Sequence, residues 1–393
     1  MKKLIALLLA LVMVVGLVAC GAKEEAAPEA APEAAPEAAP EAAPEAAPEA
    51  EEAAPEAEAE TLYIPVMAKG FQHQFWQAVA AGSQAAADEY GVEIYFDGPA
   101  SETEIAAQVN MIEQEMAKNP KALALAALDT SAVADILDEC AEKGIPVIGF
   151  DSGVPGDTSG AVKATACTNN EAAAAIAAEK FGENADLVAK MQAATADAPV
   201  RIAVLSQDAV SASVTGRTTG FVNKMVEVAS AYGTVSVEGH DKWANKVDGA
   251  TIIVEVAVSA TTEAVDVQNS ANALLAKPDL AAVFCSNEGT VTGFLSAVSD
   301  GEDLADGGKY ADLVVAGFDA GAAQKNAVRN GWFYGSVTQD PYHIGYYAVE
   351  MAVAAAKGEA VADKDTGAQW YNAENIDDEM IALLVYDYVV PRN

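Results

Sequence analysis

Short apolar runs and stretches of helical period alternate along the chain from residue 62 onward. Strands are predicted at 62–68, 92–96, 123–128 and 147–150, and the continuous apolar run at 123–128 is typical of a parallel sheet buried on both faces. Amphipathic helices are predicted between them over 75–90 and 132–143, ended by Gly91 and Gly144. Ser101, with Glu104 three residues later, predicts a capping box at the start of another helix.

The same alternation repeats in the second half of the chain. Strands are predicted at 200–205, near 235, and at 281–285, 313–318 and 333–338. Helices are predicted around 220–231, over 264–276, from 290, near 323–330 and over 342–357. About 330 residues follow Glu60, which is too many for one core. We therefore expect an α/β fold of two doubly wound, Rossmann-like lobes with parallel sheets.

The beginning of the chain has the pattern of an export signal. Lys2 and Lys3 precede an apolar run at 4–15, which is too short to remain as a membrane span. The sequence Leu17-Val18-Ala19-Cys20 resembles a bacterial lipobox. We expect 1–19 to be a lipoprotein signal peptide and Cys20 to become the lipidated first residue. An ordinary secretory signal is the alternative.

Residues 20–60 are composed almost entirely of Ala, Pro and Glu, with Pro at every fourth position from 28 to 48. Proline at that interval excludes a continuous helix, and no apolar side chain larger than alanine is available for a core. The segment is predicted to be an extended, solvated tether. It is expected to hold the folded body away from the outer face of the cell membrane.

The charge and the histidine content exclude several kinds of partner. The formal net charge is −37, which argues against nucleic acid as a partner. His73, His240 and His343 are scattered without the spacing of a metal site. The acidic loop 300–312 lacks the spacing of a calcium loop. We expect neither a metal nor a cofactor.

Polar and aromatic side chains follow the predicted strands, where ligands bind in doubly wound folds. The side chains that follow predicted strands are Lys69, Gln72, His73, Phe75, Trp76, Asp151, Ser152, Asn287, Asp319 and Gln339. Arg217 and Trp243 are expected in loops of the second lobe. Aromatic faces stack on sugar C–H groups, and carboxylates, amides and a guanidinium bind hydroxyls. The alternatives are core packing for the aromatic pair, helix caps for the aspartates and a turn former for Asn287.

The segments that contain these residues, together with 168–170, resemble those of the type 1 periplasmic binding proteins of the ribose-binding-like branch. Members of that branch are the solute receptors of ABC sugar importers. The similarity covers the chain from about Thr61 to its end. It implies that Phe75 and Trp76 sandwich a sugar, with Asp151, Asn169, Asn287, Asp319 and Gln339 in or beside the site. It also implies a monomer that closes around a pentose, hexose or ketose and delivers it to a membrane permease.

The chain departs from the family pattern at several positions. His73 and Gln74 stand where the family often has Asn and Pro, and Ser152 stands where Arg is common. The binding Arg of the second lobe falls on Thr215, with Arg217 two residues later. Fewer guanidinium contacts allow a ligand other than ribose, and Lys69, Gln72 or His73 could compensate. Residues 247–262 are longer than the family norm and have no assigned place.

The resemblance implies three crossings between lobes, near Thr168, near Gln339 and near 367–370. The first lobe would then contain 61–168 and 340–368, and the second 169–339 and 369–393. Substituting Trp76 or Asp319 by Ala is expected to weaken sugar binding and leave the fold intact.

Other functions stay open as alternatives. The same fold could bind a nucleoside or a furanosyl signal molecule, or act as a ligand sensor. A glycosidase could use Asp151 and Asp319, but no sequence feature supplies a nucleophile or raises a pKa. A transcription regulator of this fold would need a helix-turn-helix where this chain has its export signal. Cys140, Cys167 and Cys285 are expected as buried thiols, with pairing of the last two as a further alternative.

Overall fold

The computed structural model describes residues 61–71 and 73–386 of the 393-residue chain. The predicted signal peptide (1–19), the predicted tether with Cys20 (20–60) and Gln72 lie outside the described residues. All of these described residues belong to one structural unit. Within the described ranges, no helix combines the length and the apolar character that crossing a bilayer requires.

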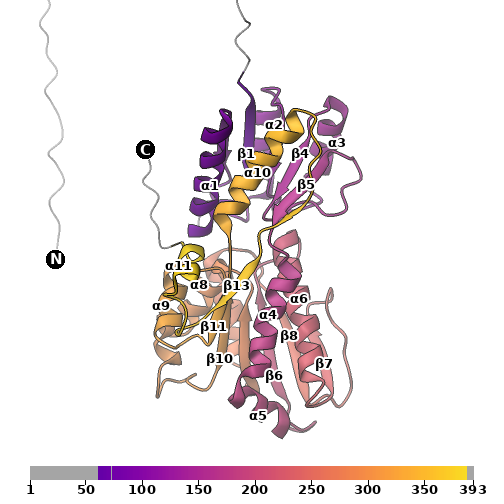
Figure 1. Ribbon diagram of the computed structural model, residues 1–393. Coiled ribbons are helices and arrows are strands. Elements are labelled where there is room, and N and C mark those ends of the chain that lie inside the picture. Colours follow the sequence, from indigo (N-terminus) through magenta and orange to yellow (C-terminus); the bar gives the residue numbers. More distant parts are fainter. Residues whose placement is uncertain (1–60, 72, 387–393) are drawn as a thin grey trace, which may run out of the picture. The chain divides into compact units, whose positions relative to one another are not determined.

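The first sheet has six strands in the order β12-β5-β4-β3-β1-β2, and its pairings are parallel. The strands are β1 (Tyr63–Met67), β2 (Glu93–Asp97), β3 (Leu123–Leu125), β4 (Val147–Phe150), β5 (Val162–Cys167) and β12 (Lys364–Asp365). The order of β1 to β5 is that of a doubly wound fold, whose ligands bind beyond the carboxyl ends of the strands. This sheet forms the upper lobe in Figure 1.

The second sheet has seven strands in the order β13-β11-β10-β9-β6-β8-β7. The strands are β6 (Val200–Ser206), β7 (Val235–Gly239), β8 (Ile252–Val258), β9 (Leu280–Cys285), β10 (Val314–Phe318), β11 (Gly335–Gln339) and β13 (Ala368–Tyr371). Its pairings are parallel except that of β13 with β11. The carboxyl ends of the parallel strands therefore meet at one edge of this sheet as well.

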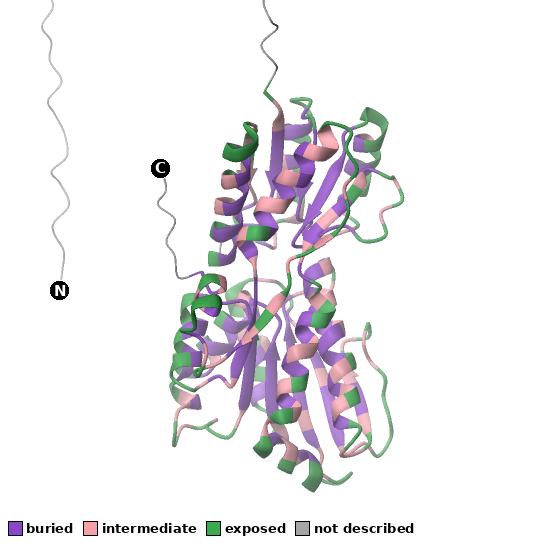
Figure 2. Cartoon of the chain, viewed as in Figure 1, coloured by how far each residue is buried: buried purple, intermediate pink, exposed green. Residues whose placement is uncertain are grey.

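Helices cover both faces of each sheet. In the first lobe α1 (Gln74–Tyr90) and α10 (Pro341–Ala356) cover one face, and α2 (Ile105–Met116) and α3 (Ala134–Lys143) cover the other. In the second lobe α4 (Asn170–Glu183), α5 (Ala185–Ala193) and α6 (Ala212–Ala229) cover one face. The other is covered by α7 (Ala264–Leu275), α8 (Glu288–Ala297) and α9 (Ala322–Arg329). Figure 2 shows the buried sheets between helices with exposed outer faces.

Helices α1 and α10 pack closely because glycine stands at their contact. A Cβ atom at Gly82 would lie 1.8 Å from the carbonyl oxygen of Tyr342, so only glycine fits there. This contact places α10 in the first lobe although its sequence follows the strands of the second.

Three connections join the lobes in the part of the chain that the structure describes. They run from β5 to α4, from β11 to α10 and from β12 to β13. The hydroxyl of Thr168, in the first connection, donates to the carbonyl oxygen of Gly367, in the third, at 3.1 Å. The segment from α10 to β13 is visible as the orange-to-yellow strand of chain between the lobes in Figure 1.

The structure confirms the predicted strands and helices, with ends that differ by a few residues in most of them. The capping box at Ser101 is wrong: α2 begins at Ile105, and the Ser101 hydroxyl donates to Glu263 of the other lobe at 2.9 Å. The unassigned residues 247–262 contain β8, which lies between β6 and the edge strand β7. The pattern did not reveal β5, α4, α5, the short strands β12 and β13, or α11 (Glu379–Leu384).

The three described cysteines are free thiols. Cys140 and Cys285 are buried, and Cys167 is partly buried. Cys167 ends β5 in the first sheet and Cys285 ends β9 in the second, so the alternative in which they pair is wrong. Burial raises the pKa of the Cys140 and Cys167 thiols to about 12 in each case.

Candidate functional site

A cavity lies between the lobes, at the carboxyl ends of strands from both sheets. The space between its lining atoms is about 290 Å³, a figure that includes open solvent. The first lobe contributes Lys69, His73, Phe75, Trp76, Glu102 and Asp151, and the second contributes Val214, Arg217, Asn287, Asp319 and Gln339. The site therefore exists only where the two lobes meet.

Two aspartates line the cavity in a backbone conformation that few side chains adopt. Asp151, directly after β4, has φ +50°, and Asp319, directly after β10, has φ +75°. This region is strained for residues other than glycine and is tolerated best by Asn and Asp. Asp151 is followed by β5, and Gly321 is the N-cap of α9, so neither aspartate caps a helix that follows it. Oδ2 of Asp319 instead accepts from the N–H of Glu288, the first residue of α8, at 3.1 Å. Strained residues of this kind cluster at functional sites.

Arg217, on α6, lies between these two carboxylates. Its Nη2 is 3.9 Å from Oδ1 of Asp151 in the other lobe, and its Nη1 is 3.4 Å from Oδ2 of Asp319. The guanidinium stacks on the ring of Phe318 at 4.0 Å and donates through Nε to Oδ1 of Asn170 at 2.8 Å. Only 3% of Arg217 is exposed, so these interactions act in a region of low effective dielectric.

Thr215, the position that the family pattern gave to the binding arginine, is not in the cavity lining. Its hydroxyl donates to the backbone carbonyl of Ser211 at 2.8 Å, within its own helix. The prediction that Thr215 lines the site is therefore wrong, whereas Arg217 brings a guanidinium into the cavity.

Lys69 and Glu102 form a second buried pair in the cavity. Glu102 accepts hydrogen bonds from Nε1 of Trp76 at 2.9 Å and from Nε2 of Gln207, in the other lobe, at 2.7 Å. Nζ of Lys69 lies 4.0 Å from Glu102 and 3.8 Å from Asp151.

The pKa values of these groups reflect a balance between burial and pairing. Burial alone would raise the pKa of Glu102, but Lys69, His73 and the two donated hydrogen bonds hold it below its ordinary value. Burial alone would lower the pKa of Lys69, but Glu102 and Asp151 hold it above its ordinary value. For Asp151 burial prevails over Lys69 and Arg217, and the pKa is raised. Lys69 and Glu102 are therefore both charged at neutral pH.

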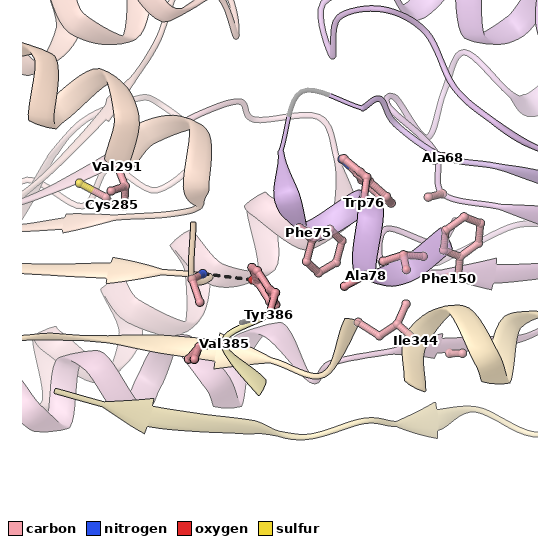
Figure 3. Close-up of a cluster of buried hydrophobic side chains, with 14 of the residues drawn as sticks. Ala68, Phe75, Trp76, Ala78, Phe150, Cys285, Val291, Ile344, Val385 and Tyr386 are labelled. Atoms are coloured by element: carbon pink, nitrogen blue, oxygen red, sulfur yellow. Dashed lines mark hydrogen bonds between the residues drawn. The ribbon is translucent and has the colours of Figure 1, made fainter. Parts of the chain in front are cut away.

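Phe75 and Trp76 begin α1 and serve both the core and the cavity. They are 5% and 2% exposed, and both belong to the buried cluster in Figure 3. Their rings meet edge to face, with centroids 5.0 Å apart and planes at 86°. Because the two rings touch, a sugar cannot lie between them, and the sandwich that the family resemblance implied for this pair is wrong.

A carboxylate of the second lobe interacts electrostatically with the first residues of α1. Negative charge is favourable at this end of a helix. Burial raises the pKa of Glu288, although His73 and the backbone N–H groups of Gln74 and Phe75 oppose the rise.

Asn287 and Gln339 complete the second lobe's part of the cavity. Oδ1 of Asn287 accepts from the N–H of Thr290 in a capping box, while its Nδ2 donates to Gln207 at 2.6 Å. Its role as a local cap is therefore real but does not exclude a role in the site. Gln339 donates to Asp319 at 2.7 Å, and within the described residues its buried Oε1 has no hydrogen-bond partner.

The structure does not place every predicted residue in the cavity. Ser152, Asn169 and Trp243 are not in its lining. The Ser152 hydroxyl accepts from the N–H of Ser213 at 3.3 Å, and the Trp243 indole donates to Thr219 at 2.9 Å. Asn169 caps α4.

Four residues in or beside the cavity were missed: Glu102, Gln207, Val214 and Glu288. Gln207 directly follows β6, so the rule that ligands bind beyond strand ends could have found it. Glu102 follows β2 by a few residues, but the incorrect capping box assigned its segment to a helix start. Val214 is apolar, so a search for polar side chains beyond strand ends could not have found it.

Comparison with known proteins identifies the family. Residues 64–360 match the model of the periplasmic binding protein domain. A curated relative, the D-allose-binding periplasmic protein of Escherichia coli K12, is 24% identical over 315 residues, which cover 79% of this chain and 90% of the relative.

Two solved structures are similar over most of the described chain. One, an ABC transporter, LacI family transcriptional regulator from Brachyspira murdochii, is 42% identical with TM-score 0.70, covering 83% of this chain and 99% of that one. The other, an Agrobacterium radiobacter carbohydrate transporter solute-binding protein in complex with D-arabinose, is 27% identical with TM-score 0.66, at 83% and 99% coverage. This chain, with its two parallel α/β lobes and the cavity between them, belongs to the periplasmic binding protein domain family.

Proposed function

We propose that the protein binds a monosaccharide in the cavity between its lobes and delivers it to an ABC importer. The observation that carries this proposal is the set of Asp151, Arg217 and Asp319, which presents hydrogen-bonding groups from both lobes to one small cavity. A sugar hydroxyl both donates and accepts, so it can bind a carboxylate and a guanidinium together.

The remaining lining supports the same ligand class. The Oε1 atom of Gln339 is a buried acceptor that a hydroxyl donor could satisfy. Phe75 and Trp76 add apolar surface for sugar C–H groups. The relatives that bind D-allose and D-arabinose have neutral polyhydroxylated ligands.

Binding is coupled to hinge closure in this proposal. Several contacts cross between the lobes, including Gln207 to Glu102 at 2.7 Å and Lys69 to Ser213 at 3.4 Å. Ser101 and Glu263 add another at 2.9 Å. A ligand held by both lobes favours the closed form over the open one, and the permease would recognise the closed form.

No bond is broken in this proposal. A glycosidase acting through Asp151 and Asp319 would need one of them as a free proton donor or nucleophile. Both instead lie within ion-pair distance of Arg217, and Asp319 also accepts from Gln339. These contacts favour ligand binding over catalysis. A nucleoside is the alternative ligand, and it shares the furanose hydroxyls.

A thermal-shift panel tests the function. D-Ribose, D-arabinose, D-allose, D-fucose, D-tagatose, ribitol and adenosine are each added to the purified protein. At a concentration about 100 times its Kd, a bound ligand stabilises the fold by about 2.7 kcal/mol, which raises Tm by several degrees. We expect at least one monosaccharide to do so. A shift with adenosine alone would favour the nucleoside, and hydrolysis of aryl glycosides would contradict a pure binding protein.

We also propose that the protein works outside the cytoplasm as a membrane-anchored monomer. Residues 1–19 would be the signal, Cys20 the lipidated residue and 20–60 the tether. The first lobe would contain 61–168 with 340–368, and the second 169–339 with 369–393.

Cys20→Ser is expected to release the protein from the membrane fraction into the soluble extracytoplasmic fraction, because the acyl chains can no longer be attached. Immunoblots of fractionated cells measure this, with Cys140→Ser as a control that should remain in the membrane fraction. Unchanged membrane association of Cys20→Ser would refute the anchor.

A further inference from the structure

Two tyrosine hydroxyls near the end of the chain hold the peptide group that links Asp319 to Ala320. The hydroxyl of Tyr371, on β13, donates to the carbonyl oxygen of Asp319 at 2.7 Å. The N–H of Ala320 donates to the hydroxyl oxygen of Tyr386 at 3.1 Å, the bond dashed in Figure 3. Tyr371 is fully buried and Tyr386 is 9% exposed. Neither residue belongs to the cavity lining.

The backbone at Asp319 needs such support. Its φ of +75° belongs to a strained region, which persists only where surrounding contacts hold it. If the peptide group between Asp319 and Ala320 shifted, the carboxylate of Asp319 would move and its contacts with Arg217 and Gln339 would be lost. Those partners line the cavity and would reorganise around a ligand, whereas the tyrosines hold the backbone from outside it.

The segment that carries Tyr386 is itself held in place. The hydroxyl of Thr338 donates to the carbonyl of Leu384 at 2.9 Å, and Nζ of Lys325 donates to that of Val385 at 2.7 Å. Tyr386 has φ +54°, an unfavourable value for a bulky residue. The backbone is therefore strained at both Tyr386 and Asp319, which indicates that the contacts around them hold both residues in place.

We propose that Tyr386, together with Tyr371, is a positioning residue for Asp319, so that the C-terminal segment 379–386 supports the binding site from outside the cavity. The proposal rests on the proposed function. It adds a supporting segment, which does not touch the cavity, to the residues that line it.

The test compares Tyr386→Phe and Tyr371→Phe with Tyr63→Phe. The hydroxyl of Tyr63 donates to Glu115 at the opposite end of the first sheet, so its loss is a matched control. Affinities for D-arabinose and D-allose are measured by calorimetry, and the rate of hydrogen exchange at the Ala320 amide is measured in the absence of sugar. We expect Tyr386→Phe and Tyr371→Phe each to weaken binding about 3–10-fold, and the control to leave it unchanged. Exchange at Ala320 should be faster in Tyr386→Phe.

The results separate this proposal from the proposed function. If the unsubstituted protein binds a sugar and Tyr386→Phe binds it equally well, the positioning role is wrong. If no sugar in the panel binds the unsubstituted protein, the proposed function fails. In that case the exchange rate of the Ala320 amide still tests whether Tyr386 supports the Asp319 backbone. Unchanged exchange at Ala320 in Tyr386→Phe would overturn that support.

Discussion

Arg217→Met is expected to abolish sugar binding and to lower the free energy of unfolding by about 3–5 kcal/mol. The substitution removes the cation between Asp151 and Asp319 and leaves two carboxylates buried beside each other, at 4% and 5% exposure. Removing one partner of a buried ion pair is more destabilising than removing the whole pair, because the remaining charge stays desolvated. Urea unfolding measures the stability, and calorimetry with D-arabinose and D-allose measures the binding.

Two further variants show whether the effect belongs to the cavity. Arg217→Met combined with Asp319→Asn should recover part of the stability without recovering binding, because one unpaired charge is gone. Arg201→Met is the matched control: Arg201 pairs with Glu255 and Asp279 at the amino end of β6, away from the cavity. It should retain sugar binding. Near-normal affinity in Arg217→Met would exclude the proposed role of the guanidinium.

Trp76→Ala is expected to destabilise the fold by about 3–5 kcal/mol in addition to weakening sugar binding. Sequence reasoning expected the fold to remain intact, but Trp76 is only 2% exposed and packs against Phe75 and Phe150. The substitution leaves a cavity in this cluster and also removes the donor to Glu102. Thermal unfolding and calorimetry measure the two effects on the same sample.

Two variants separate loss of the site from loss of stability. Phe181→Ala empties a comparable buried position in the second lobe, against Phe221, and should destabilise the fold while the folded protein still binds sugar. Trp76→Phe keeps most of the ring and should retain more stability than Trp76→Ala, yet it lacks the indole N–H that Glu102 accepts. If Trp76→Ala keeps both the stability and the affinity of the unsubstituted protein, the assignment of Trp76 to core and cavity is wrong.

Residues adjacent to strand ends were predictable, and residues placed by loops or helices were less so. Asp151, Asp319 and Gln339 stand at or directly after the ends of β4, β10 and β11, and the cavity contains all three. Glu102 lies in a turn several residues beyond β2, where its local sequence resembled a helix cap. Trp243 has suitable chemistry for a sugar site, but its indole bonds to α6 instead.

The sequence by itself determined the class of the fold, because buried parallel strands need unbroken apolar runs and the helices between them need a different period. It also determined that ligand chemistry would gather at the strand ends. Only the tertiary structure decided that Arg217 rather than Thr215 reaches the two aspartates, and that Glu102 accepts a hydrogen bond from Gln207 of the other lobe. It also decided that Tyr386 supports Asp319 from the far end of the chain. These contacts join residues distant in sequence, and their geometry depends on how the two lobes pack, which no local pattern encodes.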